Sequence, residues 1–232
     1  MEEIRTKGVV IDAIDYKEYD KIITIFTLEL GVIKAVVKGV KKPTAKMRFA
    51  GQILCFGEFI LSKRGDMYTV ITLDLVESFF EIAYNYEKFL LSVDLIKIVK
   101  FVNKYNPDSS ELFVVFVAIL NVLLKTQTDN NVVYIKFLIE TLKALGYEHE
   151  YKICEKCRKP HEEYAYIDKF SGAIVCRDCV KDKSLRLNKD ICDFLDLVAG
   201  TSYVELEGLT LPEEKLLNAL KYLQILFKIN CG

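Results

Sequence analysis

Four cysteines, arranged as two matched pairs, are the residues of this 232-residue chain whose type and spacing most clearly predict chemistry. Cys154 and Cys157 form one C-x2-C pair, Cys176 and Cys179 form the other, and eighteen residues separate the two pairs. A C-x2-C turn lets two thiolates reach one ion, and two such turns complete the tetrahedron that Zn²⁺ accepts from sulfur. The spacing therefore predicts one structural Zn²⁺ ion held by these four residues.

The alternatives to zinc are two disulfides or four reduced thiols without a metal. The chain has seven cysteines, and an odd number fits a framework of disulfides poorly. The N-terminus carries acids where an export signal needs bases, so we expect a cytoplasmic protein whose thiols stay reduced. Cys55, Cys192 and Cys231 stand singly among apolar neighbours, and we expect them to be small buried side chains.

A catalytic zinc site is a further alternative, because residues 161–163 read His-Glu-Glu and precede the second cysteine pair. This order is superficially similar to the H-x-E … P-C-x-x-C pattern of nucleobase deaminases. However, only twelve residues lie between Glu163 and Cys176, and Val175 stands where that pattern has proline. Four sulfur ligands also leave no open position for an activated water. We therefore expect a closed metal site, no catalytic residues and no enzymatic activity.

The first eighty residues read as strands rich in Val, Ile, Thr, Phe and Tyr and punctuated by glycines. The expected strands are residues 4–14, 21–28, 32–40, 56–63 and 68–76. In the third strand, apolar Ile33, Ala35 and Val37 alternate with a set that includes Lys34 and Lys38, which predicts one buried face and one lysine-bearing face. Five short strands predict a small barrel, and the OB-fold is the commonest five-stranded candidate. Residues 41–55 would form the long connection between its third and fourth strands.

From about residue 81 the apolar period becomes helical. The residues that follow it in a first helix, which ends before Asn106, are Phe89, Leu90, Val93, Ile96 and Val99. Asp108 is expected to cap a second helix, with Glu111 as its return partner. Further helices are expected at residues 129–145 and 190–199, each followed by a glycine. A last helix begins near Pro212, and its inward side chains are expected to be Leu216, Leu220, Leu223 and Phe227.

The order of these elements predicts an α+β protein, with an N-terminal five-stranded OB-fold barrel followed by an all-helical domain that carries an inserted four-cysteine zinc ribbon. The expected boundaries are 1–80 for the barrel, 81–150 for the first helical part, 151–183 for the zinc-binding insert and 184–232 for the C-terminal helical part. Residues 164–172 of the insert are expected to form a short hairpin. Zinc would contribute ~10 kcal/mol or more to folding a motif with so little core.

Charge is distributed unevenly over the expected barrel, although the net charge of the chain is only −1. Residues 34–64 carry eight cations against Glu58, a local balance of +7, whereas residues 12–20 have a balance of −3. Such asymmetry indicates one face for polyanions, and a single-strand groove needs cations at phosphate spacing with aromatics for base stacking. The aromatics of this stretch are expected to lie mostly in the core; they are Phe49, Phe56, Phe59 and Tyr68. A solvated loop is the alternative for the lysines, and solvated surface is the favoured interpretation of the acidic stretch over a protein contact.

The longest apolar run covers residues 112–124 and is interrupted by Asn121. A helix of that length spans about 20 Å, short of the ~30 Å hydrocarbon core. We therefore expect a buried helix and no membrane partner.

The first 42 residues contain several short motifs whose order along the chain is informative. Residues 18–21 read Glu-Tyr-Asp-Lys, residues 24–27 read Thr-Ile-Phe-Thr, and residues 38–42 read Lys-Gly-Val-Lys-Lys after a turn at Gly31. With two C-x2-C pairs placed inside a helical half, this order resembles the RecO family of bacterial DNA repair and recombination mediators over essentially the whole chain. The resemblance implies an OB-fold, a helical domain and a zinc ribbon, without enzymatic turnover.

The resemblance also implies binding to single- and double-stranded DNA, annealing of complementary strands and, with RecR, help in loading RecA onto DNA coated by the single-strand binding protein SSB. The implied metal ligands are the four cysteines, and the implied DNA-binding residues are Lys34, Lys38, Lys41, Lys42, Lys46, Arg48, Lys63 and Arg64. The acidic C-terminal tail of SSB would bind an apolar pocket rimmed by Lys or Arg. The protein would work in the bacterial cytoplasm, associated with the nucleoid. The alternative is a zinc-ribbon adaptor that joins proteins and has no direct DNA role.

Overall fold

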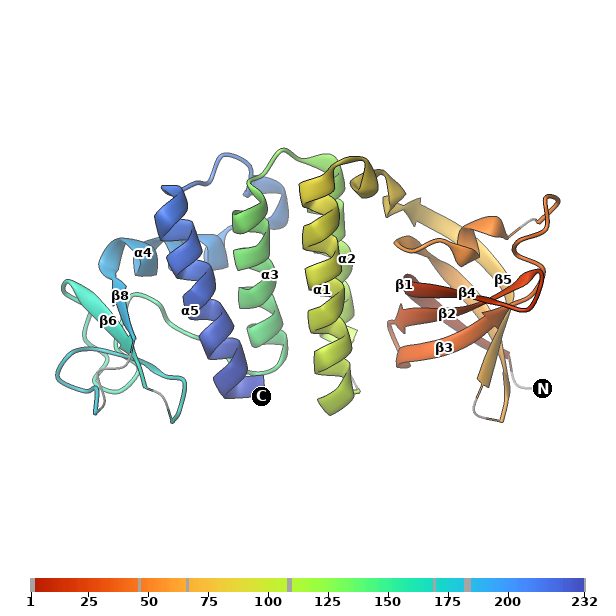
Figure 1. Cartoon of the computed structure of the whole chain (residues 1–232). Helices are drawn as coiled ribbons and strands as arrows, with labels where there is room; N and C mark the ends of the chain where they lie inside the picture. Colours follow the sequence, from red (N-terminus) through yellow and green to blue (C-terminus); the bar gives the residue numbers. More distant parts are fainter. Residues whose placement is uncertain are drawn as a thin grey trace. The chain divides into compact units, whose positions relative to one another are not determined.

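The computed structural model describes residues 3–45, 47–65, 67–107, 110–168, 170–181 and 185–231, and for Arg64 it describes the backbone alone. The chain divides into two compact units, Met1–Leu124 and Lys125–Gly232. The first unit holds a β-barrel, and the second holds the cysteine segment (Figure 1). The four-part division expected from the sequence stays a prediction.

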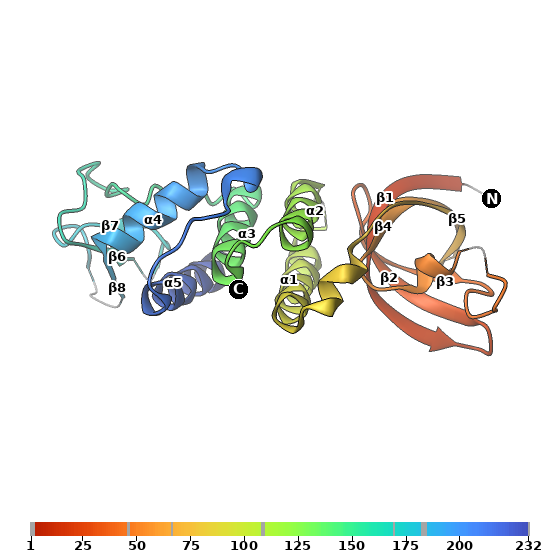
Figure 2. The same ribbon diagram turned by 90° about the horizontal axis from the view of Figure 1, so that it is seen from above.

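The first unit is built on the strands β1 (Glu3–Tyr16), β2 (Asp20–Thr27), β3 (Gly31–Val37), β4 (Cys55–Arg64) and β5 (Met67–Ser78). Their order is β1-β2-β3-β5-β4, and β4 pairs again with β1, so the sheet closes into a barrel. Only the β3–β5 pair is parallel among these described strands. Figure 2 shows the strands curving round into a ring. This is the five-stranded topology of an OB-fold, as expected, and each strand end lies within three residues of the end expected from the sequence.

Alternation along the strands fills the inside of the barrel with apolar side chains. The fully buried ones include Val10, Ile23, Ile25, Phe59 and Leu61. On β3, Ala35 and Val37 are buried while Lys34 is exposed, and the next lysine, Lys38, is exposed just beyond the strand. The expected division of this segment into an apolar face and a lysine-bearing face is confirmed.

Two helices of the first unit, α1 (Tyr86–Tyr105) and α2 (Ser110–Lys125), follow a short 3-10 segment, η2 (Phe79–Tyr84). Phe26 of β2 packs edge-on against Phe113 of α2, with ring centroids 5.4 Å apart. Asn103 of α1 accepts a hydrogen bond of 2.8 Å from the backbone N–H of Val32. Neighbouring Gly31 has φ +62°, and a Cβ there would lie 2.4 Å from Asn103 Oδ1. The glycine therefore allows both the turn and the close approach of α1 to the barrel.

The buried face of α1 differs from the one that spacing alone indicates. Phe89 and Leu90 are 38% and 45% exposed, whereas Leu91 and Leu95 are buried. The apolar stripe near the start of the helix is thus displaced by one residue from the expected position. The expected cap at Asp108 lies outside the described residues.

The second unit contains α3 (Asn130–Ala144), α4 (Lys189–Gly200) and α5 (Glu213–Cys231), with α3 packed against both of the others. The apolar face of α5 is buried as expected, at Leu216, Leu220, Leu223 and Phe227. Lys136 of α3 is only 3% exposed, and its ammonium donates to the carbonyls of Val198 and Ala199 while pairing with Glu140. The buried charge is therefore satisfied by the last turn of α4, where a cation also complements the helix dipole.

Within the described ranges, no helix is long and apolar enough to cross a membrane. The apolar run at residues 112–124 lies in α2, where Phe113 and Phe116 both pack near the ring of Phe26. The run is a packed helix of the first unit, as expected.

Candidate metal centre and nucleic-acid interface

The four cysteine sulfurs gather at one point of the second unit. All four Sγ atoms of Cys154, Cys157, Cys176 and Cys179 lie within 4.8 Å of one another, and the Cys157 and Cys176 sulfurs are 3.7 Å apart. A tetrahedral zinc with Zn–S bonds of about 2.3 Å needs sulfurs about 3.8 Å apart. All seven cysteines are free thiols, so the disulfide alternative finds no support. The donor set and its spacing fit a metal ion.

Local backbone hydrogen bonds shape both cysteine turns. In the first turn the N–H of Arg158 donates to the carbonyl of Cys154, and the N–H of Cys157 points at the Cys154 sulfur at 3.5 Å. In the second turn the N–H groups of Cys179 and Val180 both donate to the carbonyl of Cys176. Each turn therefore presents its two sulfurs on the same side, as a shared ion requires.

The buried thiol of Cys154 is prepared for the thiolate form. Burial raises its pKa, but the backbone N–H groups of Cys157, Cys176 and Lys156 outweigh burial and lower the pKa to about 6. Hydrogen bonds to a sulfur favour its negative form, which is the form that binds a metal. The four cysteines could therefore hold a metal ion, with Cys154 as the innermost ligand.

A small sheet supports the two turns, and its strands are β6 (Tyr164–Ile167), β7 (Ile174–Val175) and β8 (Arg186–Asn188), in the order β7-β6-β8. β6 and β7 form the hairpin expected between the cysteine pairs. Asp168 closes the hairpin by accepting from the N–H groups of Phe170 and Ser171, and it pairs with Lys156 of the first turn. The hydrogen bond from Lys156, followed by the one from the Phe170 N–H, lowers the pKa of Asp168 to about 2.

His161 does not join the cysteine cluster. Its side chain is 2% exposed, and neither ring nitrogen has a hydrogen-bond partner among the described residues. In the part of the chain that the structure describes, the four cysteines are the only group of His, Cys, Asp or Glu side chains close enough to hold a metal. The deaminase-like alternative, which needs a histidine beside two cysteines, is not supported by this arrangement.

The cations of residues 34–64, the basic segment, lie on several elements of the first unit. Lys38, Lys41 and Lys42 share the turn after β3, and all three are exposed. Lys63 of β4 lies opposite Tyr68 of β5. Tyr68 also pairs with Ala35 of β3, the residue that follows Lys34. Exposed Arg48 begins the 3-10 segment η1 (Arg48–Gly51). Lys46 and the side chain of Arg64 lie outside the described residues. The assignment of these eight residues to DNA stays a prediction.

The acidic stretch folds onto the turn formed by residues 38–42, hereafter the basic turn. Asp20 Oδ1 accepts a 2.8 Å hydrogen bond from the N–H of Gly39, and the N–H of Lys41 donates to the carbonyl of Tyr19. Asp15 pairs with the ammonium of Lys41 at 2.8 Å, and this exposed contact lowers the pKa of Asp15. The sequence pattern indicates solvated surface, but part of this stretch holds the basic turn in place. Because Lys41 is already paired with Asp15, its charge is only partly available to a phosphate.

Three tyrosines with a lysine over each ring lie on the same barrel. The ammonium of Lys17 is 5.2 Å from the ring centroid of Tyr16, and the Lys42–Tyr19 and Lys63–Tyr68 pairs are each 5.5 Å apart. Tyr16 and Tyr19 are 39% and 42% exposed. Tyr16 and Tyr19 are not among the DNA-binding residues expected from the sequence, because they stand in the acidic stretch. Their position at the short turn between β1 and β2 could have indicated that they are exposed. Phe59 is buried as expected, whereas Phe49 is exposed.

Two family models together cover nearly all of the chain. The model described as Recombination protein O N terminal matches residues 1–79, and the model described as Recombination protein O C terminal matches residues 83–228. The chain belongs to the RecO family. The boundary between the two RecO models falls just after β5, where the barrel ends. The expected family is therefore confirmed, and membership gives the chain a role in DNA repair and recombination.

Relatives named DNA repair protein RecO match along most of their length. The relative from Acetivibrio thermocellus is 30% identical over 218 residues, covering 93% of this chain and 87% of the relative. The relative from Caldicellulosiruptor saccharolyticus is 26% identical over 223 residues, covering 96% and 91%. The relative from Clostridium perfringens is 28% identical over 211 residues, covering 91% and 86%. The similarity to RecO proteins thus includes the barrel, the helices and the cysteine segment.

Proposed function

We propose that this chain is a recombination mediator that binds single- and double-stranded DNA through its barrel, anneals complementary strands and, with RecR, helps load RecA onto SSB-coated DNA. The observation that carries the proposal is the cluster of lysines and exposed tyrosines around the basic turn, on the barrel of a chain from a DNA repair family. Lysines neutralise phosphates and tyrosines offer faces for base stacking, which are the two requirements of a single-strand groove.

The proposed mechanism needs no covalent chemistry. Lys38 and Lys42 screen the phosphates of one strand, which lowers the repulsion that a second strand meets. Tyr16 and Tyr19 hold bases unstacked and accessible to a complementary strand. The chain would therefore act as a binding protein and not as an enzyme.

The metal proposed for the four cysteines is one Zn²⁺ ion, since an all-sulfur tetrahedral set is typical of structural zinc. When bound, zinc supplies cross-linking of the two turns and no reactive position. The ion pair between Lys156 and Asp168 links the first turn to the hairpin without involving the metal ligands. The ribbon is a structural element of the second unit in this proposal.

The proposed partners are RecR and the acidic tail of SSB, and the proposed place of work is the bacterial cytoplasm at the nucleoid. A tail with acidic residues and an apolar end would need an apolar pocket with a basic rim. These assignments rest on RecO family membership, with DNA as the partner that the barrel itself favours.

The experiment is a fluorescence-anisotropy titration with a single-stranded oligonucleotide at several salt concentrations. Charge reversal at two exposed lysines, Lys38→Glu with Lys42→Glu, should weaken binding and make the slope of log K against log salt shallower by about 1.4, the value for two lost phosphate contacts. The matched control reverses Lys7 and Lys104, which are exposed lysines of the first unit outside the basic segment.

Unchanged binding by the Lys38/Lys42 variant would contradict the barrel assignment. If the wild-type chain also shows no salt-dependent affinity for DNA, the protein-adaptor alternative becomes the better account. Annealing of SSB-coated complementary strands tests the mediator activity directly, since a general DNA-binding protein need not show it.

A further inference from the structure

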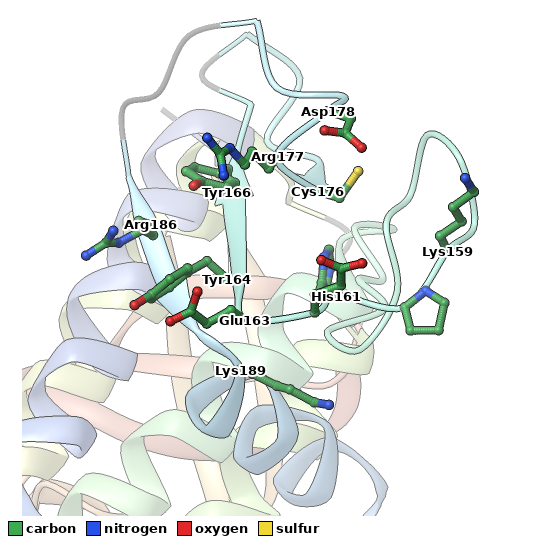
Figure 3. Close-up of a pocket in the computed structure, with 12 residues that line it drawn as sticks. Lys159, His161, Glu163, Tyr164, Tyr166, Cys176, Arg177, Asp178, Arg186 and Lys189 are labelled. Carbon is green, nitrogen blue, oxygen red and sulfur yellow. The ribbon is translucent and has the colours of Figure 1, made fainter.

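An open groove runs along the ribbon of the second unit, between the two cysteine turns and the start of α4 (Figure 3). The residues that matter for its chemistry are Lys159, Arg177, Arg186, Lys189, Tyr164 and Tyr166. They come from the first turn, the second turn, the small sheet and α4, so the groove exists only when the ribbon is folded. We call it the ribbon groove.

Within the described part of the chain, the four cations of the ribbon groove form no ion pair with an acid. Among the described residues, no ion pair involves Lys159, Arg177, Arg186 or Lys189. Other cations of the same segment are paired: Lys152 with Asp196, Lys156 with Asp168 and Arg158 with Glu150. The groove thus holds four cations without an ion pair among the described residues, and phosphate oxygens could take the place of the missing carboxylates there.

One wall of the groove presents stacked flat groups. The guanidinium carbon of Arg186 lies 4.1 Å from the ring centroid of Tyr164, the shortest cation–ring distance found in the described structure. Figure 3 shows Arg186 and Tyr164 on neighbouring strands of the small sheet, with Arg177 and Tyr166 among the other residues that line the groove. The outer face of an exposed guanidinium held in this way can stack on a nucleic-acid base.

The acidic residues of the groove lower its net charge, and this favours a nucleotide strand over a bare phosphate or an acidic peptide. Glu162, Glu163 and Asp178 also line it, so its formal charge is only +1 with the histidine neutral. A bare phosphate or an acidic peptide would gain little from so small a net charge. A nucleotide strand gains base stacking on the Arg186–Tyr164 pair in addition to phosphate contacts, and the acidic groups can accept from base amino groups.

We propose that the ribbon groove is a second binding site for single-stranded polynucleotide, separate from the barrel interface. The inference builds on the proposed annealing function, because annealing brings two strands to one protein. The barrel lysines and tyrosines hold one strand, and the Arg186–Tyr164 pair with Lys189 holds the other. The zinc ribbon would then have a ligand of its own in addition to its structural role.

The first test maps contacts on the whole 232-residue chain loaded with zinc. An oligonucleotide carrying 5-iododeoxyuridine is cross-linked by ultraviolet light, and the modified peptides are identified by mass spectrometry. We expect cross-links at Tyr164, the less buried of the two groove tyrosines, as well as on the barrel. In the Lys38→Glu, Lys42→Glu chain, the ribbon cross-links should remain while the barrel cross-links decline. Cross-links confined to the barrel would overturn the proposal and leave the proposed function intact.

The second test reverses Arg186→Glu with Lys189→Glu. Both side chains are exposed, and neither forms an ion pair among the described residues, so the fold and the zinc content should be unchanged, as circular dichroism and metal analysis would check. Annealing should slow about tenfold, while the affinity of the barrel for a first strand and its salt slope should stay close to those of the wild type, because the barrel contacts are unchanged. The matched control reverses Lys221 and Lys228, exposed lysines of the same unit that do not line the groove.

A conservative variant keeps the test informative. Arg186→Lys retains the charge but loses the planar group, so annealing should fall to a value between those of the wild type and the double reversal. Wild-type annealing by the double reversal would sink the idea. The proposal would also be wrong if an acidic peptide bound the groove, lost that binding in Arg186→Glu, and the oligonucleotide cross-links lay outside the groove.

Discussion

At the scale of single residues, Asp20 shows how an acid can serve a site for polyanions. Its carboxylate accepts from the N–H of Gly39 and so fixes the basic turn, which carries Lys38 and Lys42. Replacing it, as Asp20→Ala, removes a negative charge, and electrostatics alone would then raise DNA affinity. We expect the opposite: loss of one hydrogen bond worth about 1 kcal/mol should loosen the turn and weaken single-strand binding about fivefold.

The control for Asp20 is Asp20→Asn, which removes the charge but keeps an oxygen acceptor at the same place. Its affinity for a single-stranded oligonucleotide, measured by anisotropy, should equal or exceed that of the wild type. Tighter binding by Asp20→Ala than by the wild type would show that the charge matters and the turn does not.

Residue identity alone could not reveal this contact or the exposed tyrosines beside it. The Asp20–Gly39 and Asp15–Lys41 contacts join residues 19 and 26 positions apart, and they form only because β1, β2 and β3 pair in one register. The cysteine ligands, in contrast, were predictable because each pair is closed by a local turn. Spacing of three residues carries that information directly in the sequence.

At the scale of elements, the hairpin and the first cysteine turn are coupled through Asp168. Its pKa of about 2 lies below the ordinary value of 3.8, so the ionised carboxylate stabilises the folded ribbon above that value and loses this effect as pH falls from about 4 to about 2. Asp168→Asn should lower the free energy of unfolding by about 1.5 kcal/mol at neutral pH. Thermal unfolding of both proteins, measured across this pH range, should show the difference shrinking toward pH 2.

Glu162→Gln is the comparison for this prediction, because Glu162 is an exposed acid of the same segment with no ion pair among the described residues. It should unfold like the wild type at every pH. A constant difference between Asp168→Asn and the wild type from pH 7 to pH 2 would mean that the lost contact is not ionic.

Elements were predictable where local pattern and tertiary burial agree. The strands and α5 follow this rule, because alternation and helical spacing both select the residues that pack inside. The start of α1 breaks it: Phe89 fits the helical spacing but is 38% exposed, since the barrel and η2 decide which side of that turn is covered. The ribbon groove could not be predicted either, because Arg186 meets Tyr164 only through the strand order β7-β6-β8.

At the scale of the whole molecule, the barrel of the first unit and the ribbon of the second differ in what holds them together. The barrel has a continuous apolar core that includes Val10, Ile25 and Phe59. The apolar cluster around the metal ligands has as its buried members only Cys154, Tyr166 and Val175 among the described residues. Metal binding should therefore be essential to the ribbon and nearly irrelevant to the barrel.

Removal of the metal by a chelator separates these contributions. The bound ion is expected to supply ~10 kcal/mol or more to the ribbon, so its loss should raise amide hydrogen exchange across residues 151–188 while exchange in the barrel strands stays slow. Cys157→Ser should have the same effect and lower the zinc content, whereas Cys231→Ser, which changes a cysteine outside the cluster, should keep one ion per chain. Binding of one strand by the barrel should survive in all of these proteins, but annealing should fail without the metal because the ribbon groove is lost with the ribbon. Equal exchange increases in both units, or full annealing by the metal-free chain, would contradict this division of labour.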